Sequence, residues 1–322
     1  MKTTSALIGL IAVVSLAGCA STSSPAPSVP ASSAATTATQ TTSSQGPVTV
    51  AYADSSPTQT MDIYLPGGQQ EPTPVVVLIH GGAFKMGDSS MEAEYAQTLV
   101  ENGFAVAAVN YRLSGEAAYP AGAQDVKAAV RYLRANAAEY NINPDEIAAW
   151  GQSAGGYLAN LLGATGDQET IFDNDELGNA EQSSAVQAVV SWFGPSNFAT
   201  MDEQAAEVTA CAGQAQSHGT ADSPESLWLG EAVNTSDQTD STDLTAYVSK
   251  ASTLPAWYLA HGDSDCLVPG GQSAELQEAL DAAGADSTYV VLEGAGHMDQ
   301  AFDSTQLQPT IDFLKATFGM SW

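Results

Sequence analysis

The chain has very few basic residues. Only 8 of its 322 residues are Lys or Arg, whereas 37 are Asp or Glu, and the formal net charge is −29. Binding to nucleic acid or to an anionic lipid surface depends on clustered basic side chains, so this composition excludes nucleic acid as a partner and repels anionic membranes. The acidic excess resembles the surfaces of salt-adapted proteins, but a composition inherited from the lineage explains it equally well.

Cysteine is also scarce. Cys19, Cys211 and Cys266 are the only three, and no metal-ligand spacing occurs in the chain. We therefore expect neither a metal nor another cofactor. Cys211 and Cys266 form an even pair in a chain that we expect to be exported, which predicts a disulfide; two free thiols are the alternative. Neither has the histidine partner expected of a cysteine nucleophile.

The N-terminal apolar run is too short to cross a bilayer. It extends from Ala6 to Leu16 and fits the hydrophobic region of a signal peptide. The following Leu16-Ala17-Gly18-Cys19 resembles the lipobox of bacterial lipoproteins, which predicts that residues 1–18 are removed and that Cys19 is lipidated. An ordinary secretory signal is the alternative. Either way we expect export, and cleavage removes Lys2, which brings the formal charge to −30.

A segment of low complexity follows. Residues 19–46 are almost wholly Ser, Thr, Ala and Pro, and no charged residue occurs between Ala20 and Gly46. Such a segment cannot bury enough apolar surface to fold, so we expect a tether between a lipid anchor in the cell envelope and a folded domain. The remaining residues, 47–322, suffice for one α/β domain with a buried core.

Strand-like and helix-like segments alternate through this domain. Such alternation predicts a mainly parallel central sheet covered by helices on both faces. We expect strands at Val48–Ala53, Met61–Leu65, Val75–His80, Phe104–Asn110, Glu146–Trp150, Val186–Phe193, Ala256–His261 and Thr288–Leu292. We expect helices at Met91–Asn102, Ala121–Ala138, Ala154–Leu162, Gly271–Ala283 and Ser304–Phe318.

The segment Gly151-Gln152-Ser153-Ala154-Gly155 follows one expected strand and precedes an expected helix. In this context the pattern predicts a nucleophile elbow, a strained turn that exposes a serine at its tip. Ser153 is therefore the candidate catalytic nucleophile. A Ser/Gly-rich turn without chemical consequence is the alternative for the motif taken alone.

A glycine-containing loop, His80-Gly81-Gly82-Ala83-Phe84, follows the apolar strand Val75–Ile79. Small consecutive residues let backbone amides approach a negatively charged oxygen in an acyl-transfer transition state. We assign this oxyanion hole to the amides of Gly82, Ala83 and Ala154. His80 is expected to orient the loop rather than to react. The alternative is a glycine turn that only closes a strand.

An acid and a base follow the last two expected strands. The segment 261–269 contains Asp263 and Asp265, and His297 ends the segment Gly294–His297. The chain order serine, aspartate, histidine is the order of the α/β-hydrolases. His297 is therefore the candidate base, with a buried structural imidazole as the alternative, and the two aspartates compete for the role of the acid.

These motifs, together with Met61–Pro66, Asn110–Ser114 and Asp125–Arg131, resemble the α/β-hydrolases of the esterase/lipase group related to hormone-sensitive lipase. The resemblance extends from Thr60 onward and is strongest to the bipartite feruloyl and acetyl-xylan esterase domains. In that family the acid is the fifth residue of a His-Gly-x-x-Asp segment, which is Asp265 here.

Two residues depart from the family pattern. Ala83 replaces a more frequent third glycine, and Asn110 stands where Asp is common. Neither departure removes a catalytic atom, because the oxyanion contact uses backbone. The resemblance implies a cofactor-free serine esterase, which we expect to be a monomer, acting on acetyl or feruloyl esters of plant polysaccharide.

The alternating pattern is lost between Pro195 and Leu254. A long irregular stretch inside a compact domain usually has a function, so we interpret residues 195–254 as a cap insertion that helps to define the substrate pocket. A tolerated surface insertion is the alternative. Three other functions remain open for the chain: a peptidase, an arylformamidase-like amide hydrolase, and a non-catalytic binding lipoprotein.

Overall fold

The computed structural model describes residues 46–166 and 168–321. The expected signal peptide, Cys19 and nearly all of the expected tether lie outside the described residues. Among the helices of the described part, none has both the length and the apolarity needed to cross a membrane.

The described chain is built on one eight-stranded sheet, with the order β1-β2-β4-β3-β5-β6-β7-β8. β1 and β2, and β2 and β4, pair antiparallel, and all other neighbours pair parallel. The strands are β1 (Val48–Ala51), β2 (Thr60–Tyr64), β3 (Thr73–Ile79), β4 (Ala105–Val109), β5 (Ile142–Gln152), β6 (Ala188–Trp192), β7 (Ala256–Gly262) and β8 (Ser287–Leu292). All eight expected strands are present, with shifted ends.

Helices cover both faces of the sheet. They are α1 (Ala93–Glu101), α2 (Ala121–Ala135), α3 (Ala137–Tyr140), α4 (Ala154–Thr165), α5 (Met201–Glu207), α6 (Pro224–Leu229), α7 (Leu244–Val248), α8 (Gly271–Ala283) and α9 (Gln300–Thr317). Short 3₁₀ turns add η1 (Ser89–Glu92), η2 (Asp175–Leu177), η3 (Phe198–Thr200), η4 (Thr209–Cys211) and η5 (Thr239–Thr242). The sheet is therefore the middle layer of an α/β-hydrolase fold, as expected.

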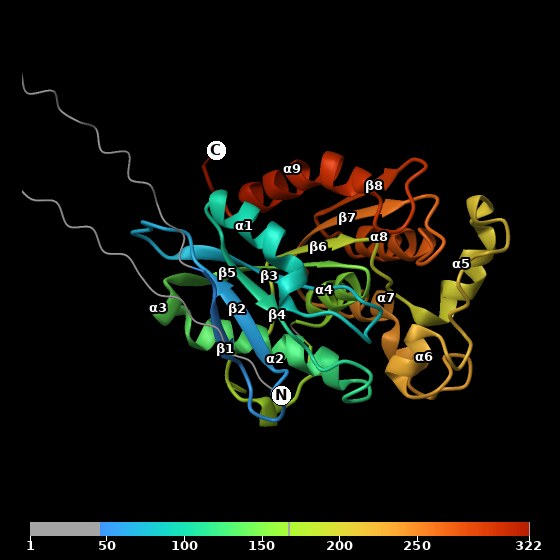
Figure 1. The fold of residues 1–322 in the computed structure, drawn as a ribbon, viewed down its shortest axis with the longest axis horizontal. Helices are drawn as coiled ribbons and strands as arrows, with labels where there is room; N and C mark the ends of the chain where they lie inside the picture. Colours follow the sequence, from blue (N-terminus) through green and yellow to red (C-terminus); the bar gives the residue numbers. More distant parts are fainter. Residues whose placement is uncertain (1–45, 167, 322) are drawn as a thin grey trace, which may run out of the picture. The chain divides into compact units, whose positions relative to one another are not determined.

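The core divides into two clusters because side chains alternate across a strand. In β3, Val75, Val77 and Ile79 join the cluster that includes α2, α4 and α8. Val76 and Leu78 join the opposite cluster, which includes α1 and α9. Figure 1 shows α1 and α9 together on one side of the sheet and α2 on the other. Burial on both faces explains why β3 is a continuous apolar run.

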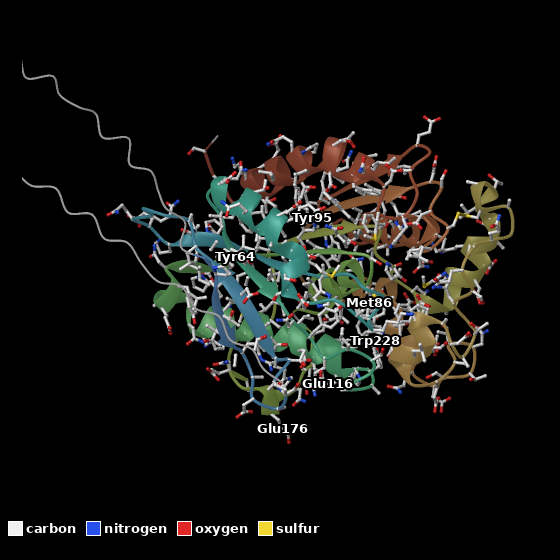
Figure 2. All side chains as sticks on the ribbon, viewed as in Figure 1. Tyr64, Met86, Tyr95, Glu116, Glu176 and Trp228 are labelled. Carbon is white, nitrogen blue, oxygen red and sulfur yellow. A yellow bond between two sulfur atoms is a disulfide. The ribbon has the colours of Figure 1, made fainter. Side chains whose placement is uncertain are left out.

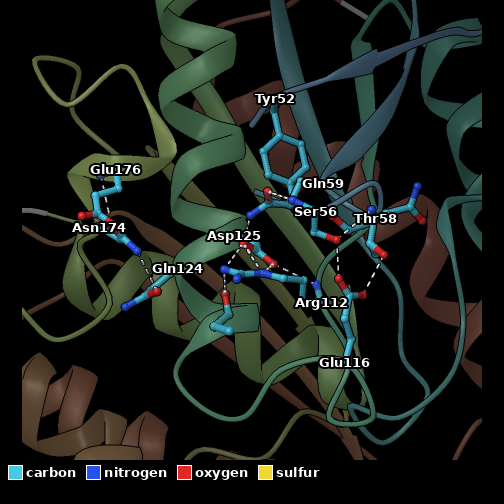
Figure 3. Close-up of polar contacts among 12 residues, drawn as sticks. Tyr52, Ser56, Thr58, Gln59, Arg112, Glu116, Gln124, Asp125, Asn174 and Glu176 are labelled. Carbon is cyan, nitrogen blue, oxygen red and sulfur yellow. Dashed lines mark hydrogen bonds and ion pairs between the residues drawn. The ribbon is translucent and has the colours of Figure 1, made fainter. Parts of the chain in front are cut away.

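A partly buried ion pair explains two of the sequence motifs. The Arg112 guanidinium donates to both carboxylate oxygens of Asp125 on α2, with its Nη2 at 2.8 Å from Oδ1. Gln59 Nε2 also donates to Asp125 Oδ1 at 2.7 Å, which connects α2 to the loop between β1 and β2 (Figure 3). The hydrogen bonds to Asp125 raise the pKa of Arg112. These residues of the family motifs are therefore structural.

Asn110, one of the two departures from the family pattern, also has a structural role. Its Oδ1 accepts a hydrogen bond from the Ser89 amide at 2.7 Å, and its Nδ2 donates to Thr60 Oγ1 at 3.0 Å. The side chain therefore joins η1 to the start of β2. An aspartate could accept from Ser89, but it could not donate to Thr60.

The segment between β6 and β7 differs from the expectation. We expected residues 195–254 to be an irregular stretch, but this segment contains α5, α6 and α7 and three 3₁₀ turns. These helices have only 5–7 residues, which is shorter than the window in which helical periodicity can be recognised. Local capping marks the starts of α6 and α7 instead, since Ser223 accepts from the Ser226 amide and Asp243 from the Thr245 amide.

Candidate active site

Ser153 lies in the turn between β5, which ends at Gln152, and α4, which begins at Ala154. Its backbone has φ 55° and ψ −124°, a conformation that is strained for a residue with a side chain. A Cβ on Gly155 would overlap the carbonyl oxygen of Ile79, and a Cβ on Gly151 would overlap that of Gly155. The two glycines are thus required by close backbone contact, and the turn holds Ser153 at the carboxyl end of β5.

The structure brings Ser153, His297 and Asp265 together from three strand ends. His297 Nε2 lies 3.0 Å from Ser153 Oγ, and His297 Nδ1 lies 2.7 Å from Asp265 Oδ2. A carboxylate only accepts hydrogen bonds, so Nδ1 is the donor and neutral Nε2 is left as an acceptor for the hydroxyl. Phe193 packs edge-on against the His297 ring, with 4.7 Å between ring centroids. This geometry is that of a nucleophile, a base and an orienting acid.

Asp265 is buried and has more partners than the sequence predicts. Its Oδ1 accepts from the amides of Leu267 at 2.8 Å and Val268 at 2.9 Å. Burial acts to raise the pKa of Asp265, but hydrogen bonds from His261 and His297 outweigh it and lower the pKa below its ordinary value. The carboxylate is therefore ionised throughout the neutral range.

His261 is the partner that the sequence reasoning missed. Its Nε2 lies 3.0 Å from the Val268 carbonyl oxygen and 3.4 Å from Asp265 Oδ2, while its Nδ1 lies 2.7 Å from Ser273 Oγ. Since a carbonyl only accepts, Nε2 is the donor. The signal was available, because His261 is the first residue of the His-Gly-x-x-Asp segment.

Asp263, the competing acid, has a different environment. It is exposed, and its Oδ1 accepts a hydrogen bond from the Gly294 amide at 2.7 Å. Asp263 therefore ties the turn after β8 to the loop after β7. It positions the segment that carries His297, in agreement with its interpretation as a turn residue.

The loop that carries Gly82 and Ala83 is strongly bent. Gly82 has φ 114°, and Ala83 and Phe84 have φ 56° and 60°. The Gly82 carbonyl accepts from the amides of Lys85 and Met86, whereas the amides of Gly82 and Ala83 donate to no described residue. Both amides are thus available to an oxyanion. Ala83 adopts the left-handed region without being glycine, at a cost of about 1–2 kcal/mol.

His80 is buried below this loop. Its ring stacks on Tyr111 with 4.5 Å between centroids, and its Nδ1 donates to the Gly81 carbonyl at 2.7 Å. Burial lowers the pKa of His80. These contacts hold the loop, and within the described chain none joins the imidazole to Ser153.

A small pocket of about 40 Å³ opens beside Ser153, and residues 195–254 contribute to it. Its lining comprises Ala83, Phe84, Ser153, Ala154, Pro195, Gln216, Pro224, Glu225, Leu267 and Val268. Trp228, which Figure 2 labels, lies on α6, and its ring stacks on Phe84 with 4.2 Å between ring centroids. The insertion is therefore packed against the candidate oxyanion loop and forms one wall of the pocket.

A disulfide joins the insertion to the loop of Asp265. Cys211 and Cys266 are bonded, with 5.5 Å between their Cα atoms. The Gln216 amide also donates to the Cys266 carbonyl at 3.0 Å. The pocket wall and the acid loop are thus connected covalently and by hydrogen bonding. In the portion that the structure describes, no cluster of three or more His, Cys, Asp or Glu side chains could hold a metal ion.

The comparison with protein families decides the classification. The BD-FAE family model matches residues 61–280, which is more than half of the chain. The chain belongs to the BD-FAE family. In curated proteins, the BD-FAE chain is 27% identical to esterase LipQ of Mycobacterium tuberculosis over 266 residues, covering 76% of this chain and 58% of LipQ. It thus spans little more than half the length of that relative.

Solved structures include close matches to this BD-FAE protein. A truncated carbohydrate esterase from gut microbiota is 33% identical with a TM-score of 0.73, covering 85% of this chain and 96% of that chain. A bifunctional GH43-CE protein of Bacteroides eggerthii is 32% identical with a TM-score of 0.72, covering 83% of this chain and 37% of that chain. The BD-FAE chain is an α/β-hydrolase whose relatives are carboxylesterase-type hydrolases.

Proposed function

We propose that the protein is a serine carboxylic-ester hydrolase that works through an acyl-enzyme. The observation that carries the proposal is the 3.0 Å distance between His297 Nε2 and Ser153 Oγ, with Asp265 hydrogen-bonded to the far side of the ring. His297 accepts the Ser153 proton as Oγ attacks the ester carbonyl, and it returns that proton to the oxygen of the leaving alcohol. Asp265 fixes the tautomer and stabilises the imidazolium.

Water then completes the reaction. His297 accepts a proton from the attacking water, and the acid is released as the proton returns to Ser153 Oγ. The amides of Gly82, Ala83 and Ala154 stabilise the negative oxygen in both steps, and each donor of this kind contributes roughly 3–4 kcal/mol. No metal or other cofactor takes part.

The proposed substrates are acetyl or feruloyl esters on plant polysaccharide. The support is the 33% identity to a carbohydrate esterase and the 32% identity to a GH43-CE protein. We further propose that residues 1–18 are removed, that Cys19 is lipidated, and that residues 19–46 tether a monomeric domain outside the cytoplasm. A polymeric substrate outside the cell suits an exported enzyme.

Labelling by a fluorophosphonate probe tests the mechanism. The probe should modify Ser153 in the wild type and should not modify Ser153→Ala. The variant should retain less than a hundredth of the wild-type kcat on 4-nitrophenyl acetate, because the hydroxyl is the nucleophile. Equal unfolding curves provide the control for folding. Substantial turnover by a folded Ser153→Ala would contradict the triad assignment.

Product analysis tests the substrate class. Acetate release from acetylated xylan and ferulate release from methyl ferulate should both be lost in Ser153→Ala. Activity on 4-nitrophenyl acetate without release from either compound would exclude these substrates.

Metabolic labelling with a radioactive fatty acid tests the proposed lipid anchor. The label should mark the wild type and should not mark Cys19→Ser. Equal labelling of the two proteins would exclude the anchor.

A further inference from the structure

The insertion contains a buried contact between a histidine and a glutamate that the triad does not use. Glu225 is only 4% exposed and His218 only 1%. His218 Nδ1 lies 3.1 Å from Glu225 Oε2. Within the described chain, however, the two ring nitrogens of His218 make no well-oriented hydrogen bond. The same is true of Glu225 Oε2. A buried carboxylate with unused hydrogen-bonding capacity is costly, which calls for a reason.

A polar scaffold holds this pair in place. The His218 amide donates to Asp202 Oδ1 at 2.6 Å, and Ser223 Oγ donates to the His218 carbonyl at 2.6 Å. Ser223 also caps α6, the helix whose first turn contains Glu225. The position of Glu225 is thus fixed by both the helix start and the His218 loop.

Glu225 lines the same pocket as Ser153. The rest of the lining is small or apolar apart from Ser153 and Gln216. Oε2 of Glu225 faces His218 and is buried, so Oε1 is the carboxylate oxygen that a group bound in this pocket can meet on the wall formed by α6. An alkyl group would leave that acceptor unpaired, whereas a hydroxyl group could donate to it.

The pocket takes the acyl side of the ester. Its lining includes Ser153 and the candidate oxyanion residues Ala83 and Ala154, but not His297. The leaving alcohol oxygen must lie beside His297 to receive its proton. The group that enters the pocket is consequently the one that stays bonded to Ser153.

We infer that Glu225 is a specificity-determining residue that accepts a hydrogen bond from a hydroxyl group on the acyl chain. The enzyme then prefers short hydroxylated acyl groups over alkyl groups of the same length. This inference rests on the proposed esterase function. To the acetyl and feruloyl esters proposed above it adds a preference for a hydroxyl group among short acyl chains. The start of α6 and the loop of His218 hold Glu225 in place.

Matched esters test the inference. The 4-nitrophenyl esters of 3-hydroxybutyrate and butyrate differ by one hydroxyl, as do those of lactate and propionate. For each pair, the selectivity is the ratio of kcat/KM for the hydroxylated ester to that for the alkyl ester. Dividing the wild-type selectivity by that of a variant cancels the intrinsic reactivity of the esters.

Glu225→Leu should lower the selectivity about ten-fold or more for at least one pair, because the hydrogen bond from the acyl hydroxyl group to Glu225 is lost. Glu225→Gln, which keeps the volume and an acceptor oxygen, should lower it less. The matched control is Glu231→Leu, at an exposed position just beyond α6, and it should leave the selectivity unchanged. Fluorophosphonate titration of Ser153 corrects each preparation for its active fraction.

Two results would overturn the inference. Unchanged selectivity in both Glu225 variants would exclude the hydrogen bond. An equal fall in kcat/KM for both members of each pair, together with a lower melting temperature, would show that Glu225 only stabilises the insertion. If Glu225→Leu does not fold, Glu225→Gln still decides between these results. Failure of the proposed function is distinguishable, since the wild type would then neither turn over any ester nor react with the probe.

Discussion

Asp265 and Asp263 are two residues apart, but their side chains meet different partners. Asp265 is buried between His297 and His261, whereas Asp263 is exposed and holds the Gly294 amide. Asp265→Asn should lower kcat about 10⁴-fold, as the equivalent change does in a serine protease, because the tautomer and the imidazolium lose their support. Asp263→Asn should lower it less than about ten-fold, since an amide oxygen can still accept from Gly294.

Steady-state kinetics on 4-nitrophenyl acetate, with each variant's unfolding curve as the control, measures this difference. A larger loss in Asp263→Asn than in Asp265→Asn would reverse the assignment of the acid. The sequence predicted Ser153, Asp265 and His297 from their places after expected strands, and it preferred Asp265 to Asp263 only through the His-Gly-x-x-Asp segment of the family resemblance. It could not show that His261 contacts Asp265, because that contact depends on the path of the loop between them.

Glu225 illustrates a second limit at this scale. Nothing in the local sequence separates it from Glu231, six positions later, and an acidic residue in a polar stretch ordinarily faces solvent. Only the packing of α6 against the oxyanion loop buries Glu225, whereas Glu231 stays exposed. A tertiary contact therefore creates the chemical distinction between two identical side chains.

At the scale of elements, η1 contains a buried acid. Glu92 is 5% exposed, and burial raises its pKa from 4.5 to about 7. The unfolded chain ionises Glu92 near pH 4.5 and the folded chain only near pH 7, so the folded state binds more protons between these values. The contribution of Glu92 to the free energy of unfolding is therefore fully present below pH 4.5. It falls by about 3 kcal/mol as the pH rises through 7.

Glu92→Gln should remove this pH dependence. Urea unfolding at several pH values should show that the variant gains about 3 kcal/mol relative to the wild type between pH 4.5 and 8. Glu94→Gln changes an exposed acid two positions later and should show no such gain. A constant difference between Glu92→Gln and the wild type would mean that Glu92 titrates normally in the folded protein.

The disulfide predicts a second property at this scale. It links η4 of the insertion to the residue after Asp265 and closes 55 positions of chain. The double change Cys211→Ser and Cys266→Ser should lower the free energy of unfolding by up to about 4 kcal/mol. KM should rise more than kcat falls, because the insertion forms the pocket wall while the triad lies on strand ends.

Urea unfolding and kinetics on 4-nitrophenyl acetate measure both effects. Wild-type protein reduced and alkylated should match the double variant, and protein exposed to the alkylating agent alone should match the untreated enzyme. Identical stability and KM with and without the bond would show that packing alone holds the insertion. The sequence predicted this bond from cysteine count and compartment, but it did not predict α5, α6 and α7, whose few residues give no recognisable period.

For the whole molecule, charge is the dominant feature. Even if each of the 8 Lys and Arg residues paired with one acid, 29 of the 37 acidic residues would have no basic partner. Some of the basic residues already form ion pairs in the described chain, where Arg112 pairs with Asp125 and Lys127 pairs with Asp173. The remaining carboxylates repel one another, and this repulsion acts against the compact state.

Salt should therefore stabilise the protein near neutral pH. Raising NaCl from low to about 0.5 M shortens the screening length to a few ångströms and weakens repulsion between exposed carboxylates. The melting temperature should rise, by about 2–4 °C for each 1 kcal/mol of repulsion relieved. Near the isoelectric point of about 4.1, many carboxylates are protonated. The same addition of salt should therefore raise the melting temperature much less at that pH. A salt effect of equal size at both pH values would assign the stabilisation to general exclusion of salt from the surface, and the acidic composition would then carry no role in salt tolerance.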